Sequence, residues 1–77
     1  MYSELVRYIA ENLVDNPDEV RVSEEEVDGV IVVTLKVARE DMGKVIGKQG
    51  KIAKAMRMVV RAAAGKTRKK VNVDIVE

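Results

Sequence analysis

The chain has 77 residues, of which 47% are apolar and 35% charged, and its formal net charge is only +1. This composition is typical of one folded domain, over residues 1–77, near the lower size limit for a self-sufficient core. Cysteine and histidine are both absent, which excludes disulfides, thiolate chemistry and the usual transition-metal ligands, so we expect no metal and no cofactor.

The first predicted element is a helix over about residues 4–14, with Ser3 as its N-cap. Asn16-Pro17-Asp18 ends it, because proline cannot continue a helix. Apolar residues recur with helical spacing and predict one buried face: Leu5, Val6, Ile9, Ala10, Leu13 and Val14.

A β-hairpin is expected next. Val20 and Val22 alternate with polar residues, Asp28-Gly29 is a strong signal for a two-residue turn, and residues 30–37 form a β-branched run. The run is apolar on much of both faces, which favours a central strand.

Residues 40–46 predict a short helix with acidic side chains in its first turn. A glycine loop over 47–50 and a longer helix over 51–64 follow, with Gly65 as the expected C′ residue. After a basic loop over 66–70, Val71, Val73 and Ile75 alternate with polar residues and predict a closing strand.

This order, α-β-β-α-α-β, constrains the topology. The hairpin makes the first two strands antiparallel, whereas a strand–helix–helix–strand crossover normally returns parallel to the strand that it left. We therefore expect an α+β fold with a three-stranded mixed sheet and the helices packed on one face.

The candidate functional motif is Val45-Ile46-Gly47-Lys48-Gln49-Gly50-Lys51. Its glycines lack a Cβ atom and let another backbone approach closely. Lys44, Lys48 and Lys51 add positive charge, and the following helix directs its free N–H groups into the same space. Such a loop suits a phosphate backbone, although a bare G-x-x-G also occurs by chance and can be a simple helix–helix turn.

Charge is segregated along the chain. Residues 1–35 hold nine acidic and two basic side chains, whereas residues 36–77 hold twelve basic and four acidic ones. The basic half could meet a polyanion. The 51–64 helix carries a basic stripe of Lys51, Lys54, Arg57 and Arg61, and its opposite arc predicts the core residues Ile52, Ala53, Met56, Val59, Val60 and Ala63.

Ala55, Met58 and Ala62 lie beside this stripe, where a lone surface helix is usually more polar. With Val59 they predict either the floor of a groove under nucleotide bases or a close-packing patch for a second subunit; harmless alanine propensity is the alternative. Tyr2 and Tyr8 are the only aromatic residues, which argues against a sheet that reads bases by stacking.

The element order, with Ile46-Gly47-Lys48-Gln49-Gly50 between paired helices, resembles the type II KH domain over essentially the whole chain. The small size and the acidic N-terminal half resemble the bacterial RNA-binding KhpA family. The resemblance implies a non-enzymatic protein in which Gly47, Lys48, Gln49 and Gly50 clamp about four nucleotides of single-stranded RNA. Ala53 departs from the branched aliphatic residue that is frequent at its position.

Around the clamp, we expect Lys44, Lys51 and Lys54 to meet phosphates, and Gln49 to bond phosphate or sugar. Ile46, Ile52 and Val37 are candidates for an apolar floor. The basic loop 66–70 either adds phosphate contacts or complements the preceding helix end.

The resemblance also implies association, as a homodimer or with a larger, KhpB-like KH protein, through Ala55, Met58, Val59 and Ala62. From the same resemblance we expect a chaperone-like role in RNA regulation in the bacterial cytoplasm. We expect no small-molecule substrate. No signal peptide or membrane-length apolar run is apparent. The rival hypotheses are a KH-fold adaptor with little RNA binding and, more remotely, an enzyme using carboxylates or lysine.

Overall fold

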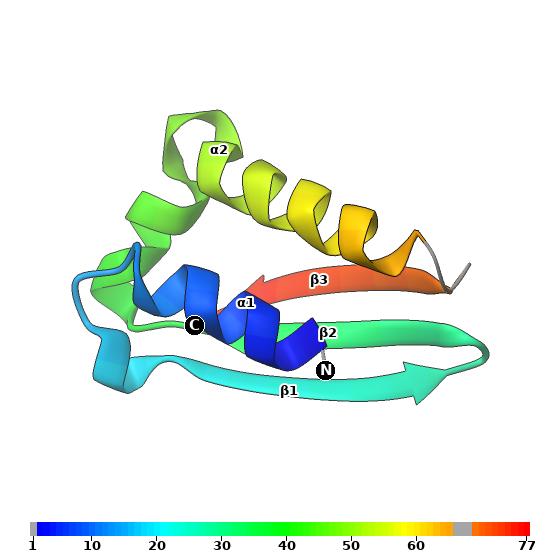
Figure 1. The fold of residues 1–77 in the computed structure, drawn as a ribbon. Coiled ribbons are helices and arrows are strands. Elements are labelled where there is room, and N and C mark those ends of the chain that lie inside the picture. Colours follow the sequence, from blue (N-terminus) through cyan, green and yellow to red (C-terminus); the bar gives the residue numbers. More distant parts are fainter. Residues whose placement is uncertain (1, 66–68) are drawn as a thin grey trace.

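The computed structural model describes residues 2–65 and 69–77, and the side chains of Lys48 and Gln49 are outside the described part. Helix α1 (Tyr2–Glu11), a 3-10 helix η1 (Pro17–Glu19) and strands β1 (Arg21–Val27) and β2 (Val30–Lys36) are followed by helix α2 (Arg39–Ala64) and strand β3 (Lys70–Val76) (Figure 1). The predicted order is confirmed, with α2 bent into two arms that correspond to the two expected helices. The short η1 was not predicted.

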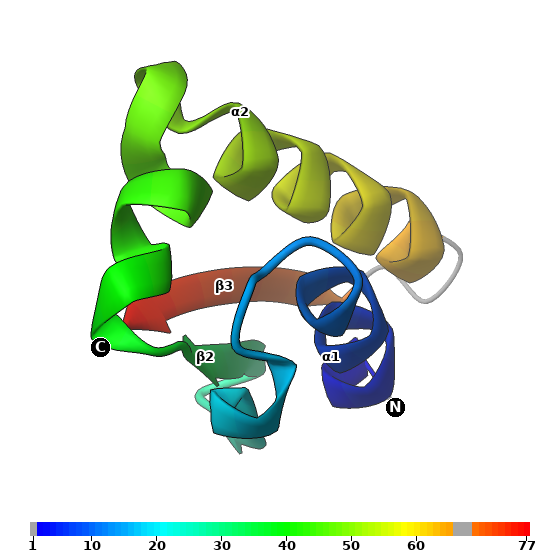
Figure 2. The ribbon, with the colours of Figure 1, turned by 90° about the vertical axis from the view of Figure 1, so that its left-hand side faces the viewer.

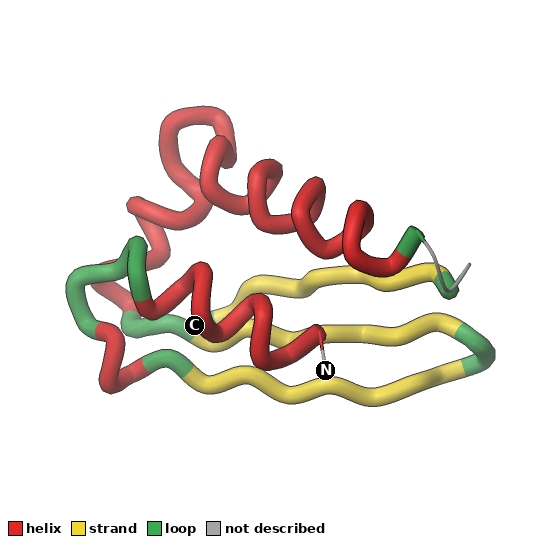
Figure 3. The backbone as a smooth tube through the Cα atoms, viewed as in Figure 1, coloured by secondary structure: helices red, strands yellow, loops and turns green. Residues whose placement is uncertain are grey.

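The three strands form one mixed sheet in the order β1-β2-β3 (Figure 3). Strands β1 and β2 pair antiparallel, and β2 and β3 pair parallel, as predicted. Asp28 and Gly29 have φ values of 51° and 80°, which is the pattern of a type I′ hairpin turn. The turn chemistry of these two residues therefore sets the register of the hairpin.

Helices α1 and α2 both lie over the same face of the sheet (Figure 2), as expected. Alternate residues of the central strand point toward them, and Val33 and Leu35 are fully buried. The other face of β2 is half-buried. The residues that close the core from the helices and the edge strand are Val6, Ala10, Val45, Met56, Val60, Val71 and Val73.

The start and the end of α1 differ from the prediction. Ser3 lies inside the helix, so its predicted role as N-cap is wrong, and its backbone N–H donates to Glu24 Oε1 of β1 at 2.8 Å. Burial raises the pKa of Glu24, but the backbone hydrogen bonds from Ser3 and Tyr2, together with positive charge nearby, bring the pKa below its ordinary value of 4.5. The helix ends at Glu11 and Leu13 is 40% exposed, so its predicted place on the buried face is wrong.

Helix α2 runs through the glycine motif, but its path turns sharply there (Figure 2). Gly50 has a φ of 68°, a value that breaks the α-helical pattern and that an L side chain rarely adopts. The bend divides α2 into a first arm, residues 39–49, and a second arm, residues 51–64. The predicted loop 47–50 is thus compressed into a helical bend.

The second arm packs a narrower stripe than its sequence predicts. Ala53, Met56 and Val60 are buried as expected. Val59 is 44% exposed and Ala63 is exposed, so their assignment to the core is wrong, because only one side of the helix faces the sheet. The helix stops at Gly65 as predicted, but Gly65 has a φ of −56° and is the C-cap residue rather than C′.

Candidate nucleic-acid interface

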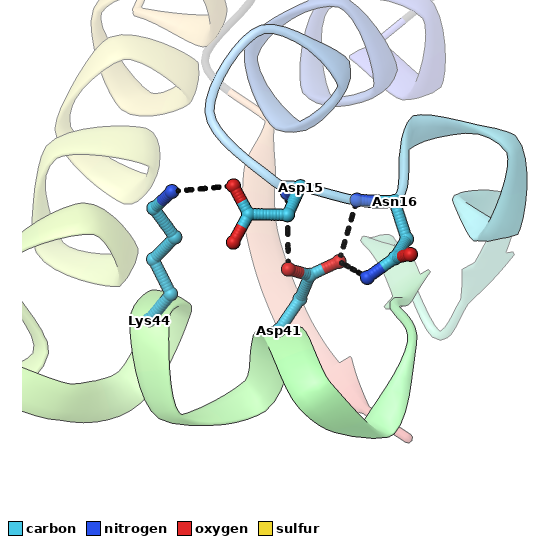
Figure 4. A network of polar contacts seen from close by, with 4 residues as sticks. All are labelled: Asp15, Asn16, Asp41 and Lys44. Carbon is cyan, nitrogen blue, oxygen red and sulfur yellow. Dashed lines mark hydrogen bonds and ion pairs between the residues drawn. The ribbon is translucent and has the colours of Figure 1, made fainter.

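The first arm of α2 is fixed in place by a buried carboxylate (Figure 4). Asp41 is 1% exposed. Its Oδ1 accepts the backbone N–H of Asp15 at 3.0 Å, and its Oδ2 accepts the backbone N–H and the side-chain Nδ2 of Asn16 at 3.1 and 3.2 Å. Asp41 therefore ties the segment after α1 to the start of α2, a role that its predicted place in the first helical turn did not reveal.

The protonation of Asp41 follows from the same contacts. Burial alone would raise its pKa, because a charged carboxylate is poorly solvated there. The hydrogen bonds from Asp15 and Asn16, with the positive charge of Lys44 nearby, reverse this effect and hold the pKa of Asp41 below its ordinary value of 3.8. The group is an anion in the native protein, and its bonds are at full strength at neutral pH.

Lys44 extends from the next turn of the same arm. Its Nζ lies 3.0 Å from Asp15 Oδ1, in a pair whose side chains are 46% and 77% exposed (Figure 4). Ion pairs this exposed contribute only about 0–1 kcal/mol. The contact orients the Lys44 ammonium beside the bend while leaving it able to exchange Asp15 for another anion.

The two arms of α2 enclose a cavity of about 160 Å³ at the bend, lined by Gly43, Lys44, Gly47, Lys51 and Ile52. A Cβ atom added at Gly43 or Gly47 would meet nothing within 4 Å apart from the adjoining residues and backbone of its own helix, and neither residue has a positive φ. Neither the packing nor the backbone of this chain demands glycine at these two positions. Gly50 is different, because its positive φ requires it.

Along the second arm of α2, a surface groove extends toward strand β3. It holds two cavities, of about 390 and 200 Å³, and we call their lining residues the basic groove. The groove carries three cations and one carboxylate among apolar and amide groups. Its residues are Lys54, Arg57, Met58, Arg61, Val71, Asn72, Val73 and Asp74.

Arg57 crosses this groove to the edge of the sheet. Its Nε and Nη2 donate to the carbonyl oxygen of Val73 at 3.3 and 3.2 Å. The Val76 carbonyl accepts from Val37 on the β2 side, and since backbone groups alternate along a strand, that of Val73 points to the outer edge. The periodicity of the helix predicted the position of Arg57 but not this contact.

The predicted site residues are partly brought together. Lys44, Lys51 and Lys54 are exposed along the bend and the groove, Ile46 is 47% exposed, and Ile52 is half-buried. Val37 is 2% exposed and belongs to the core, so its proposed place in a groove floor is wrong. The predictions for the side chains of Lys48 and Gln49, and for residues 66–68, lie outside the described part of the chain.

The predicted association patch is at the surface of the second arm. Met58 and Val59 are 70% and 44% exposed, and Ala55 and Ala62 are also exposed. Met58 lines the basic groove as well. The patch thus adjoins the groove along one helix.

Within residues 2–65 and 69–77, none of the helices is long and apolar enough to cross a membrane. In the same residues, no three Asp or Glu side chains come together as a group that could hold a metal ion.

A mixed three-stranded sheet, covered on one face by helices that meet at a glycine bend, defines a KH domain of the type II order. The sequence profile of the family described as KhpA/KhpB, KH domain, matches residues 3–75. The chain therefore belongs to the KhpA/KhpB KH-domain family.

Curated relatives agree with this assignment. A protein named RNA-binding protein KhpA from Clostridium acetobutylicum is 59% identical over 73 residues, covering 95% of this chain and 97% of the relative. Its namesake from Caldanaerobacter subterraneus has the same identity and coverage. The one from Treponema pallidum is 43% identical over 77 residues, covering all of this chain and 96% of the relative.

Among solved structures, the chain is similar to Era from Aquifex aeolicus, in a Y63A variant bound to GDP.AlF4-. The TM-score is 0.68 at 22% sequence identity, and the match covers 96% of this chain but 29% of the Era chain. At this identity the likeness concerns the fold alone.

Proposed function

We propose that this protein binds single-stranded RNA without catalysing a reaction, holding the sugar-phosphate backbone at the glycine bend. The observation that carries the proposal is that position 47, inside a helix, is a glycine. Glycine inside a helix costs about 0.5–1 kcal/mol relative to alanine, and here neither φ nor packing explains that cost. A backbone that approaches from outside the protein would explain it. The names of the relatives, RNA-binding protein KhpA, support RNA as that ligand.

The surroundings of the bend suit an RNA backbone. Lys44 and Lys51 line the cavity there, and Lys54 begins the basic groove. In this proposal their ammonium groups meet phosphates, while Gln49 bonds phosphate or sugar and Ile46 and Ile52 give apolar contact. About four nucleotides fit such a clamp. Binding is expected to be modest and to weaken with salt, because counterion release supplies much of the free energy.

A double substitution tests the clamp. Lys48→Asp with Gln49→Asp places two negative charges where the phosphates are proposed to lie, so RNA affinity should fall at least tenfold. The measurement is RNA binding at two salt concentrations, with thermal unfolding as the control for folding. Unchanged affinity of a folded double variant would refute the clamp and favour the adaptor alternative, a KH fold with little RNA binding.

Association is a second part of the proposal, favoured by the exposed patch of Ala55, Met58, Val59 and Ala62. Small residues let two helices approach closely, and an exposed methionine adapts to a partner surface. The partner would be a second copy or a KhpB-like KH protein. Two linked domains would raise the affinity for one RNA through effective concentration, in keeping with a chaperone-like role on cytoplasmic RNA.

Light scattering tests the patch. Val59→Glu should reduce the molecular mass from dimer to monomer, and Met58→Glu should do the same while also weakening RNA binding, because Met58 lines the groove. If the wild-type protein is monomeric at high concentration, only pairing with a KhpB-like protein remains as a hypothesis. If both variants still pair as the wild type does, with a second copy or with the KhpB-like protein, the patch is not the association surface.

A further inference from the structure

A further cavity lies at the end of the groove farthest from the glycine bend. Its volume is about 400 Å³, and it is bounded by the end of α2 and the start of β3. Among the described residues, three cations line it beside one amide and a few small or apolar groups. The lining residues are Arg61, Ala64, Gly65, Lys69, Lys70, Val71 and Asn72.

This far cavity continues the basic groove, because the two share residues. Arg61 lines all three cavities along the second arm, and Val71 and Asn72 line both the 200 Å³ cavity and the far one. A strand that follows the groove along β3 passes one carboxylate, Asp74, and then enters the far cavity, where none of the described lining residues is acidic.

The cations of the far cavity differ in their partners. Among the described residues, Arg61 and Lys70 form no ion pair, and both are exposed. Lys69 Nζ contacts Glu26 Oε1 of β1 at 3.1 Å, in a pair that is about half exposed on each side. Such a pair is weak, so a phosphate could replace Glu26. The carbonyl end of α2 adds only a partial negative charge.

The length of the second arm separates this cavity from the glycine clamp. From Gly50 to Gly65 a helix rises by about 22 Å at 1.5 Å per residue. Four stacked nucleotides span about 14 Å at 3.4 Å each. A strand held at the bend therefore passes the far cavity only after the four nucleotides that a clamp of this kind holds.

We propose that the far cavity is a second phosphate-binding subsite, which takes about two nucleotides of the same RNA strand beyond the first four. Arg61 supplies a planar fork of donors that matches a phosphate, and Lys70 supplies a point charge. The Asn72 side chain adds an amide at the wall. This subsite rests on the proposed RNA clamp, and it makes affinity depend on RNA length.

Oligouridylates of four, six and eight nucleotides test the subsite in the full chain. We expect the wild type to bind the hexamer about tenfold more tightly than the tetramer, and the octamer little better than the hexamer. The hexamer should also show a steeper salt dependence, by about 0.7 in slope for each added phosphate contact. In Lys69→Ala with Lys70→Ala, which removes two cations that line the far cavity alone, the gain from four to six should shrink at least fivefold, while tetramer affinity stays within twofold.

Two comparisons make the outcome specific. Arg7→Ala with Lys36→Ala removes the same charge from exposed positions outside the groove, and should leave the length dependence intact. Glu26→Gln removes the carboxylate that pairs with Lys69 and should raise hexamer affinity about twofold without changing tetramer affinity.

The results that overturn the subsite are distinct from those that overturn the clamp. Equal losses for tetramer and hexamer in the Lys69 and Lys70 variant would mean a general charge effect, and no loss for either would leave the far cavity to another partner, such as an acidic peptide. Either result refutes the subsite and leaves the clamp standing. A wild type that binds no oligonucleotide of any length would refute both.

Discussion

The two ends of the first arm of α2 differ in how far their polar groups are paired within the protein. At its start, Asp41 is buried and receives three hydrogen bonds from Asp15 and Asn16. At its end, the glycine bend lies beside exposed lysines, and two glycines have open space where side chains could stand. The fold accounts for every contact at the first end and leaves the glycines at the second unexplained.

This difference separates residues that hold the protein together from residues that are available to a ligand. Among the described residues, every buried side-chain nitrogen or oxygen has a hydrogen-bond partner, so the network around Asp41 is complete without any other molecule. Substitutions at the start of the arm should therefore change stability and those at the bend should change RNA binding.

The largest effect is expected from Asp41→Ala. It leaves the N–H groups of Asp15 and Asn16 without their acceptor in a half-buried site, which is costly to stability. For a domain of this size the melting temperature should fall by about 10 °C. Calorimetry measures it, and Asp18→Ala, at an exposed position of η1, is the control with a change of less than about 3 °C. A small shift for Asp41→Ala would mean that water replaces the carboxylate.

Acid should weaken the same end of the arm. Asp41 and Glu24 have pKa values below those of the unfolded chain, so the unfolded state binds more protons as the pH falls. Their contribution to stability is complete above about pH 5 and is lost as the pH drops through 4 and below. Melting temperatures from pH 7 to pH 3 should show this decline. Glu24→Gln should make the decline in melting temperature smaller. A melting temperature that does not change between pH 7 and pH 3 would contradict the lowered pKa values of both Asp41 and Glu24.

The glycines of the bend should respond in opposite directions. Gly47→Ala fits the helix without a clash, so it should stabilise the protein by about 0.5–1 kcal/mol while lowering RNA affinity several-fold. Gly50→Ala must adopt a φ of 68° and should destabilise by about 1–2 kcal/mol. Denaturant titration and RNA binding, measured on both variants, test these two predictions. Loss of stability in Gly47→Ala would show that the fold does need this glycine.

The smallest effect is expected where the two regions meet. Asp15→Asn keeps the backbone N–H that Asp41 accepts but removes the carboxylate paired with Lys44. Stability should change by less than about 0.5 kcal/mol, since the pair is exposed. RNA affinity at low salt should rise about twofold, because Lys44 no longer exchanges a partner. Equal affinity at all salt concentrations would place Lys44 outside the RNA path.

Local patterns were enough to predict the order of the elements, the mixed sheet and the hairpin turn. They are read from periodicity, from Asp28-Gly29 and from the connection rules, which act over short distances. What failed depends on contacts between distant segments. Ser3 could not be excluded as a cap without knowing that Glu24 lies beside it, and Val59 and Ala63 could not be placed outside the core without knowing which side of α2 meets the sheet.

The candidate site shows the same division. The glycines and lysines of the bend are neighbours in sequence and were found from the motif. Asp15 lies far from Lys44 along the chain, and Arg57 far from Val73, so no spacing rule joins either pair. Residues 69–72 could be assigned to the same site as Arg61 only after the parallel pairing of β3 with β2 was known, because that pairing places them beside the second arm.

The contact between Arg57 and Val73 also bears on whether another chain can add a strand to the edge of the sheet. Strand β3 is an edge, and the outward backbone groups of an edge strand are a template on which another chain can add a strand. Arg57 occupies the Val73 carbonyl with two donors and places a charged group over the middle of that edge. Arg57 therefore hinders cross-β aggregation at this edge, and moving its side chain away from the edge would leave the strand open to strand addition.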